Sequence, residues 1–192
     1  MTAQDVLDFW FLPPDSAAYG QQRAEWFRKD DAFDATIRTR FGPTLEQAVA
    51  GGLREWDALG APGTLARIIV LDQFTRNAWR GTAASFSGDP LALAAAQQLV
   101  DSGAAATLPP VQRWFAYMPF EHAEDARMQE RSVALFGELA AADAGFEGVL
   151  DYAHRHRGVI ARFGRFPHRN AILGRASTPD EVAYLAQPGS GF

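Results

Sequence analysis

The chain has 192 residues, of which 47% are hydrophobic, 12% aromatic and 21% charged. This balance excludes the disordered class, and the length suits one domain with a substantial core, which we expect over residues 1–192. The net charge of −5 gives no field that draws a protein to phosphate backbones or anionic lipid. Neither nucleic acid nor a membrane is therefore expected as a partner.

Two absences narrow the class of protein further. The chain contains no cysteine, which excludes disulfides, thiolate metal sites and cysteine nucleophiles. The first residues, Met1 to Asp5, have no basic region before an apolar run, and no run approaches the roughly 18 apolar residues of a membrane span. We expect a cytoplasmic protein with no cofactor, and nothing in the sequence sets an oligomeric state.

The first third of the chain predicts helices separated by proline and glycine. Thr2 opens a capping box, and apolar residues at helical spacing follow it. We expect this first helix to end before Pro13. A second, amphipathic helix should be capped by Asp30 or Asp31 and stopped at Gly42-Pro43. A helical apolar stripe then resumes over residues 45–56.

A buried central helix is predicted next. Thr64 should cap it, and residues 65–74 are apolar on most of the circumference. Polar residues one turn apart cross this helix, and we call them the polar seam. The seam consists of Asp72, Gln73, Arg76 and Asn77. Such a seam requires a polar partner.

The next helices are bounded by proline signals. Asp89 at the N-cap and Pro90 at the first helical position should start a helix that ends near Gly103. Residues 111–118 form a short aromatic-rich helix that Pro119 should break, because proline lacks an N–H donor and clashes with the preceding turn.

The last third predicts three more helices. An acidic cluster at residues 121–125 should start a long helix, where carboxylates suit the positive end of the helix dipole. Residues 145–163 should form another, ended by Gly164, and a capping box at Thr178 starts a short helix that ends near Pro188. Without any hairpin or fixed-period repeat signal, these patterns predict an all-α domain of about eight to ten antiparallel helices.

Four blocks of residues follow one another in an order that resembles a known family. The blocks are Trp26-Phe27 with Phe33-Asp34 and Arg40-Phe41, then Leu71 to Asn77, Tyr117 to Asp125, and Phe163 to Asn170 with Leu173-Gly174-Arg175. They resemble the family known as domain of unknown function 924, which is found widely in bacteria; Thr75 stands where the family usually has proline. The resemblance implies a TPR-like fold of stacked antiparallel helix pairs. It implies no reaction, because the family has none assigned.

The stretch from Arg162 to Arg175 holds four arginines, one histidine and one asparagine within fourteen residues. Because an unpaired buried charge costs several kcal/mol, these side chains need polar partners elsewhere in the chain. Three clusters could meet to form one polar site: the polar seam, the acidic cluster at residues 121–125, and the stretch from Arg162 to Arg175. The candidate catalytic residues are Glu121, His122 and His168, and the candidate ligand-binding residues are Asp72, Arg76, Asn77, Glu124, Arg165, Arg169 and Asn170.

Several functions fit this constellation. Guanidinium groups match carboxylate and phosphate, and a histidine can donate a proton near neutral pH, so we predict a small anionic ligand and hydrolase or transferase chemistry. The structural alternative is a buried salt-bridge network that locks the helices together. A metal site built on Glu121, His122, Asp125 and His168 is disfavoured by the surrounding arginines.

A protein or peptide partner is the remaining alternative, because TPR-like helix pairs present concave grooves. The aromatic residues available for such a groove are Trp10, Trp26, Trp79, Trp114 and Phe120, for which the core is the favoured location. His154 and His156, two apart on one helix, point in different directions and should face solvent or a neighbouring helix.

Overall fold

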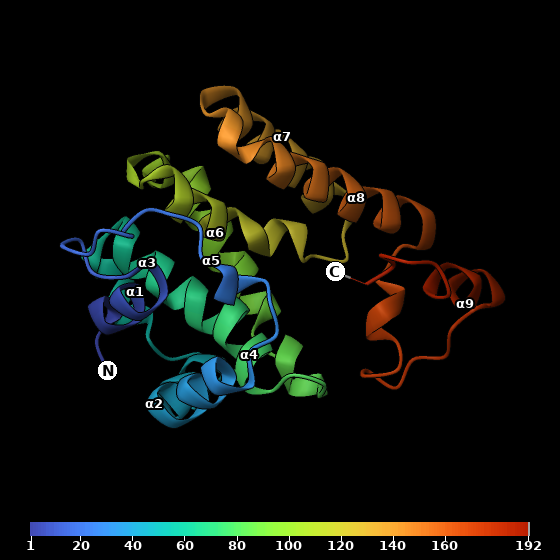
Figure 1. Ribbon diagram of the computed structural model, residues 1–192, viewed down its shortest axis with the longest axis horizontal. Helices are drawn as coiled ribbons and strands as arrows, with labels where there is room; N and C mark the ends of the chain where they lie inside the picture. Colours follow the sequence, from blue (N-terminus) through green and yellow to red (C-terminus); the bar gives the residue numbers. More distant parts are fainter. Residues whose placement is uncertain (192) are drawn as a thin grey trace. The chain divides into compact units, whose positions relative to one another are not determined.

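The computed structural model describes residues 1–191 and places them in nine α-helices with short 3₁₀ turns and no strand in that range (Figure 1). The predicted all-α class is confirmed. Contacts divide the chain into two compact units, which we describe separately. The N-terminal unit comprises residues 1–80 and 84–119, and the C-terminal unit comprises residues 81–83 and those from 120 onward. The single domain over residues 1–192 stays a prediction.

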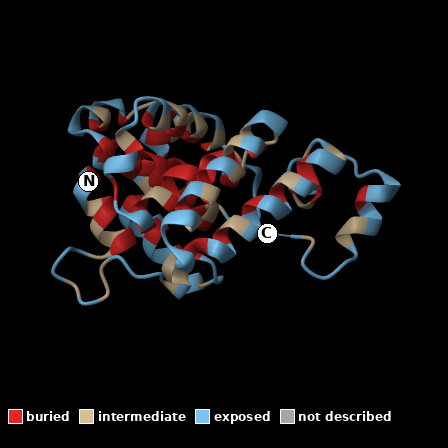
Figure 2. Ribbon diagram, turned by 90° about the horizontal axis from the view of Figure 1, so that it is seen from above, coloured by how far each residue is buried: buried red, intermediate tan, exposed pale blue. Residues whose placement is uncertain are grey.

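Six α-helices belong wholly or mainly to the N-terminal unit. They are α1 (Ala3–Phe11), α2 (Asp31–Val49), α3 (Ala61–Ile68), α4 (Thr75–Ala78), α5 (Asp89–Asp101) and α6 (Pro110–Glu121). Figure 2 shows buried residues along most of these helices. None of the helices within residues 1–191 is long and apolar enough to cross a membrane.

Helix α1 starts and ends where the sequence predicts. The Thr2 hydroxyl accepts a hydrogen bond from the backbone N–H of Asp5 at 3.1 Å, and the Asp5 carboxylate accepts the N–H of Thr2 at 2.8 Å. The helix ends at Phe11, and its C-cap residue Leu12 has a φ of +68° and a ψ of 155°. This backbone conformation is nearly restricted to glycine, and it turns the chain toward Pro13.

Helix α2 runs through the predicted stop. Asp30 caps it as expected, but the helix continues past Gly42-Pro43 to Val49. Phe41 and Leu45, on either side of the proline, are both buried in the core. Their burial outweighs the one hydrogen bond that Pro43 removes, so tertiary packing overrides the local signal.

The central helix is buried as predicted, but its start and geometry differ. It begins at Ala61 after Gly60 rather than at Thr64, and the segment Ile69–Phe74 between α3 and α4 is a π-helix. The Thr75 hydroxyl donates to the carbonyl of Leu71 at 2.8 Å within this wide turn. A Cβ on Gly88 would lie 2.1 Å from the same carbonyl, so only glycine allows this close approach.

The aromatic residues considered for a peptide groove lie mostly in the core. Trp10, Trp26, Trp114 and Phe120 are buried, and the Trp26 indole N–H donates to the carbonyl of Trp10 at 3.0 Å. Phe27 is different, because 55% of it is exposed while its ring stacks on Trp114 with centroids 5.0 Å apart.

Three helices belong to the C-terminal unit: α7 (Ala126–Ala142), α8 (Glu147–Phe163) and α9 (Pro179–Leu185). Helices α7 and α8 pack side by side, as Figure 1 also shows. Gly164 ends α8 with φ +68°, and Thr178 forms the predicted capping box of α9. Both boundary predictions, the glycine stop of α8 and the capped start of α9, agree with the structure within a few residues.

The acidic cluster is split between two helices, which corrects one prediction. Helix α6 continues through Pro119 and ends at Glu121. Glu121 therefore lies at the negative end of the helix dipole, where a carboxylate is not stabilised by it. Asp125 alone caps α7, where its carboxylate accepts the N–H groups of Arg127 and Met128. The complete burial of Phe115 and Phe120 explains why the proline fails to end α6.

Candidate functional site

The polar seam of the N-terminal unit is held by ion pairs. Arg76 donates to both oxygens of Asp89, at 2.7 and 3.0 Å, and its Nη1 also lies 3.1 Å from an oxygen of Asp72. Burial would lower the pKa of Arg76, but the charges of Asp72 and Asp89 outweigh burial and raise it. Asp89 is therefore the partner of Arg76, while Gly88 occupies the cap position predicted for Asp89.

Asn77 belongs to a second set of contacts in the same unit. Its amide donates to Asp34 at 2.8 Å, and Arg80 binds the same carboxylate through two bonds of 2.8 and 3.0 Å. Burial would raise the pKa of Asp34, but the hydrogen bonds from Arg80 and Asn77 outweigh it and hold that pKa below its usual range. These contacts join α2 to the end of α4, as the structural alternative predicts for Asn77.

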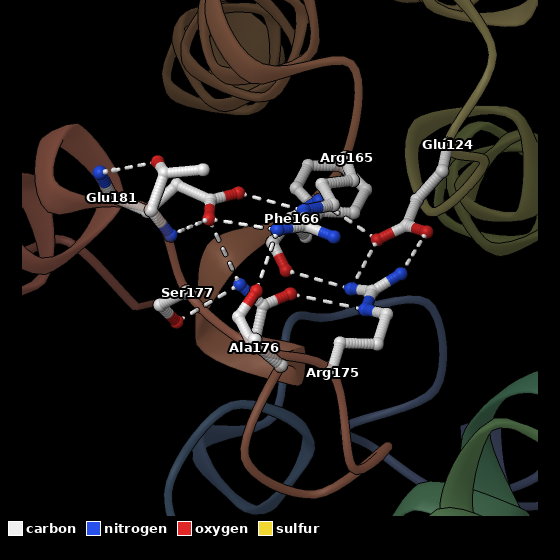
Figure 3. A network of polar contacts seen from close by, with 9 residues as sticks. Glu124, Arg165, Phe166, Arg175, Ala176, Ser177 and Glu181 are labelled. Carbon is white, nitrogen blue, oxygen red and sulfur yellow. Dashed lines mark hydrogen bonds and ion pairs between the residues drawn. The ribbon is translucent and has the colours of Figure 1, made fainter.

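In the C-terminal unit, five polar residues form what we call the carboxylate–arginine network (Figure 3). Its members are Glu124, Arg165, Asn170, Arg175 and Glu181. Arg175 binds Glu124 through bonds of 2.6 and 2.9 Å, and the backbone N–H of Phe166 donates to Glu124 at 2.7 Å. Burial alone would raise the pKa of Glu124, but these donors lower it.

The other half of the network fixes α9. Arg165 binds both oxygens of Glu181 at 2.7 and 2.8 Å, and the N–H of Thr178 donates to Glu181 at 2.8 Å. The Arg165 guanidinium, with this N–H, lowers the pKa of Glu181 to about 2. Asn170 bridges the two halves, because it donates to Glu181 at 3.3 Å and accepts from Arg175 at 3.0 Å.

Three of the four histidines lie close together in the same unit, in what we call the histidine cluster. Its members are Glu121, His122, His156, Phe166, His168 and Arg169. The rings of His156 and His168 lie 5.5 and 5.6 Å from that of Phe166, and those of His122 and His156 are 6.3 Å apart. The segments that carry these side chains are the end of α6, the middle of α8 and the 3₁₀ turn Pro167–Arg169.

The hydrogen bonds of the histidine cluster involve charged groups. Nδ1 of His156 lies 3.0 Å from a carboxylate oxygen of Glu121 and 2.9 Å from the carbonyl of Tyr152, so one ring nitrogen faces two acceptors. Arg169 donates to the carbonyl of His122 at 3.0 Å, and its guanidinium lies 4.6 Å from the centre of the Phe166 ring.

One imidazole of the cluster has a strongly altered pKa. Burial lowers the pKa of His168 to about 4, and the nearby charge of Arg169 acts in the same direction. At neutral pH this ring is therefore uncharged. It suits a proton acceptor, whereas the sequence suggested a proton donor at this position.

His156, Arg175 and Glu181 are the functional candidates that sequence reasoning missed. His156 is only 6% exposed and contacts Glu121, whereas His154 is exposed. The signal for His156 was present, because it lies on the apolar stripe of α8 with Val149, Ala153 and Ile160.

The metal alternative receives no support. Within residues 1–191, no three side chains of histidine, aspartate or glutamate come together as a group that could hold a metal ion. Asp125, one of the four residues considered, caps α7 instead.

Comparison with known proteins agrees with this helical class. The family model described as "Bacterial protein of unknown function (DUF924)" matches residues 6–189, and the chain belongs to this family. A solved structure of a protein of unknown function from Agrobacterium tumefaciens is similar, with 39% identity, 96% of each chain covered and a TM-score of 0.82. No curated protein matches the chain significantly.

Proposed function

We propose that the histidine cluster binds a small anionic ligand and supplies acid–base groups for hydrolysis or group transfer at a phosphate or acyl group. The observation that carries this proposal is that the imidazoles of His156 and His168 and the guanidinium of Arg169 all contact Phe166, with His122 next to His156. Glu121, His122, His168 and Arg169 are retained from the candidates that the sequence suggested, although the proposed role of His168 changes, and His156 joins them.

Arg169 is the proposed anion-binding group. Arg165 and Arg175 each hold a carboxylate through two bonds, so we assign them to stabilising the fold around the site. Arg169 stacks on Phe166, and its charge acts on the neighbouring imidazole of His168. A guanidinium beside the neutral imidazole of His168 favours an anion whose reaction also needs a base.

The proposed base is His168, because burial lowers its pKa to about 4 and its ring is therefore unprotonated at neutral pH. Glu121 lies 3.0 Å from Nδ1 of His156 and would orient that ring, as the carboxylate of an acid–base dyad does. Asp72, Arg76 and Asn77 are assigned to structural contacts, which supports the structural alternative for that part of the predicted site.

The second candidate is a TPR-like interaction module in which the polar residues are structural. It is favoured by the α7–α8 helical hairpin and by the saturated ion pairs of the carboxylate–arginine network. A protein or peptide would then be the partner, bound on a helix face.

The two candidates can be separated by NMR titration of the imidazole signals. Inorganic phosphate and acetate serve as probes, with Arg169→Gln as the test variant. Arg157→Gln, in the same unit, is the matched control, because Arg157 pairs only at the surface with Glu130. Shifts of His122 and His168 that vanish in Arg169→Gln but persist in Arg157→Gln support the ligand site.

The chemical part of the proposal has its own test with p-nitrophenyl phosphate and p-nitrophenyl acetate. Hydrolysis should be lost in His168→Gln and retained in His154→Gln, whose histidine is exposed. If neither probe anion moves the imidazole signals of the folded protein, the structural interpretation replaces the ligand site.

A further inference from the structure

A second candidate site lies in the N-terminal unit, where a partly enclosed cavity of about 270 Å³ opens beside α1. Its walls come from α1, from the segment that follows it, and from the starts of α3 and α6. The volume is close to the lower end of the range for small-molecule sites, roughly 300 Å³. The cavity therefore suits a compact ligand.

The apolar side of the cavity includes a residue in a strained conformation. Leu12 lines the wall with Leu7 and Phe11, and its φ of +68° with ψ 155° is a conformation that glycine adopts far more easily. Arg23 holds the adjacent end of α1, because its Nη1 donates to the carbonyls of Phe9 and Trp10 at 2.8 Å each. Strain of this kind gathers at ligand clamps, where the surroundings enforce it.

The polar side of the cavity is rich in acceptors and carries one charge. Asp8 is the charged residue of the lining, and one of its oxygens accepts a hydrogen bond from Gln4 at 2.7 Å. Gln112 donates to the Tyr19 hydroxyl at 3.2 Å, which leaves the amide oxygen of Gln112 as a further acceptor in the wall. A ligand that complements these groups carries a donor and a positive charge.

We propose that this cavity binds a small organic cation, namely a primary amine with a compact apolar body. The ammonium group would donate to Asp8, and the apolar body would contact Leu7, Phe11 and Leu12. Charge complementarity with a carboxylate in a mostly apolar wall selects the amine over a neutral or acidic molecule of the same shape. The site is independent of the histidine cluster, which lies in the other unit.

Phenethylamine is the probe, with 2-phenylethanol and phenylacetate as its neutral and anionic counterparts. Saturation-transfer NMR on the full chain should detect the amine and show weaker or no binding of the other two. The Asp8→Asn variant keeps the size of the side chain and should weaken amine binding by about tenfold or more, because a charge-assisted hydrogen bond is lost. Glu46→Gln, an equal change of charge at an exposed position of α2, should leave binding unchanged.

A second variant tests the wall. Leu12→Gly removes the apolar contact and the strain together, so it should weaken amine binding without lowering the melting temperature. Arg169→Gln should keep amine binding, which separates this site from the proposed anion site. The proposal is overturned if the alcohol binds as well as the amine, if Asp8→Asn and Glu46→Gln behave alike, or if no amine binding is detected at millimolar concentration.

Discussion

The polar seam and the histidine cluster contain similar residue types but balance their charges differently. In the seam, the buried carboxylate of Asp72 and the partner Asp89 both face the guanidinium of Arg76. In the cluster, two imidazoles and Arg169 contact the Phe166 ring, a third imidazole lies next to His156, and the imidazole of His168 is uncharged at neutral pH. The contrast shows that arginines bound to carboxylates through two bonds stabilise the fold, whereas the proposed chemistry depends on the imidazoles beside Arg169.

Arg76→Met should lower stability more than any other substitution proposed below. Removal of the guanidinium leaves Asp72, which is 1% exposed, without its ion pair, so the free energy of unfolding should fall by about 3–5 kcal/mol. Urea denaturation measures the loss. A loss below about 1 kcal/mol would remove Arg76 from the set of structural residues.

The histidine cluster should make stability depend on pH through His168. Its folded pKa of about 4 lies below the ordinary 6.5, so the unfolded chain binds more protons between these values. The free energy of unfolding should therefore fall as pH drops from about 6.5 to 4, by up to about 3 kcal/mol, and this contribution stays lost below pH 4.

The His168→Gln variant isolates this contribution. Its unfolding free energy should change less than that of the wild type over the same pH interval, as denaturation at a series of pH values would reveal. His154→Gln is the control. Parallel curves for wild type and His168→Gln would mean that His168 titrates normally in the folded chain.

Two glycine substitutions, one in each unit, should change stability in opposite directions. Gly88→Ala places a Cβ 2.1 Å from the carbonyl of Leu71, so the backbone must shift and stability should fall by about 1–3 kcal/mol. Gly137→Ala in α7 meets nothing within 4 Å and should stabilise the protein by up to about 1 kcal/mol. Melting temperatures of the two variants should thus move in opposite directions, and equal shifts would contradict the close approach at Gly88.

Arg169→Met should destabilise the protein much less than Arg76→Met. It removes one hydrogen bond to the carbonyl of His122 and a stacking contact with Phe166, worth about 1–2 kcal/mol together. Urea denaturation of this variant and of Arg76→Met, measured side by side, tests whether Arg169 contributes less to stability than Arg76. A loss as large as that of Arg76→Met would place Arg169 among the structural arginines.

Local signals predicted those parts of the fold that depend on local chemistry. The capping boxes at Thr2 and Thr178 and the glycine stop at Gly164 lie where the sequence indicated, because each boundary is made by neighbouring residues. Pro43 and Pro119 were wrongly predicted to stop their helices. In both cases distant core contacts decide, and these are invisible in a single sequence.

The sequence indicated which residue types form the candidate site, but it did not indicate which residues pair with one another. The sequence indicated that Arg165 and Glu124 need partners, but the partners are Glu181 and Arg175, which lie on segments whose meeting depends on the tertiary fold. His156 was missed because its spacing from His154 was weighed rather than its place on the apolar stripe of α8.

The π-helical segment Ile69–Phe74 sets the direction of every side chain that follows it on the central helix. A turn widened by one residue rotates the downstream positions by about 100° relative to a regular α-helix. Asn77 and Arg80 reach Asp34 on α2 only with this rotation in place. The extra residue therefore sets the orientation of the residues that follow, and deleting one apolar position of Ile69–Phe74 would turn both donors away from their carboxylate while every polar residue stays in the sequence.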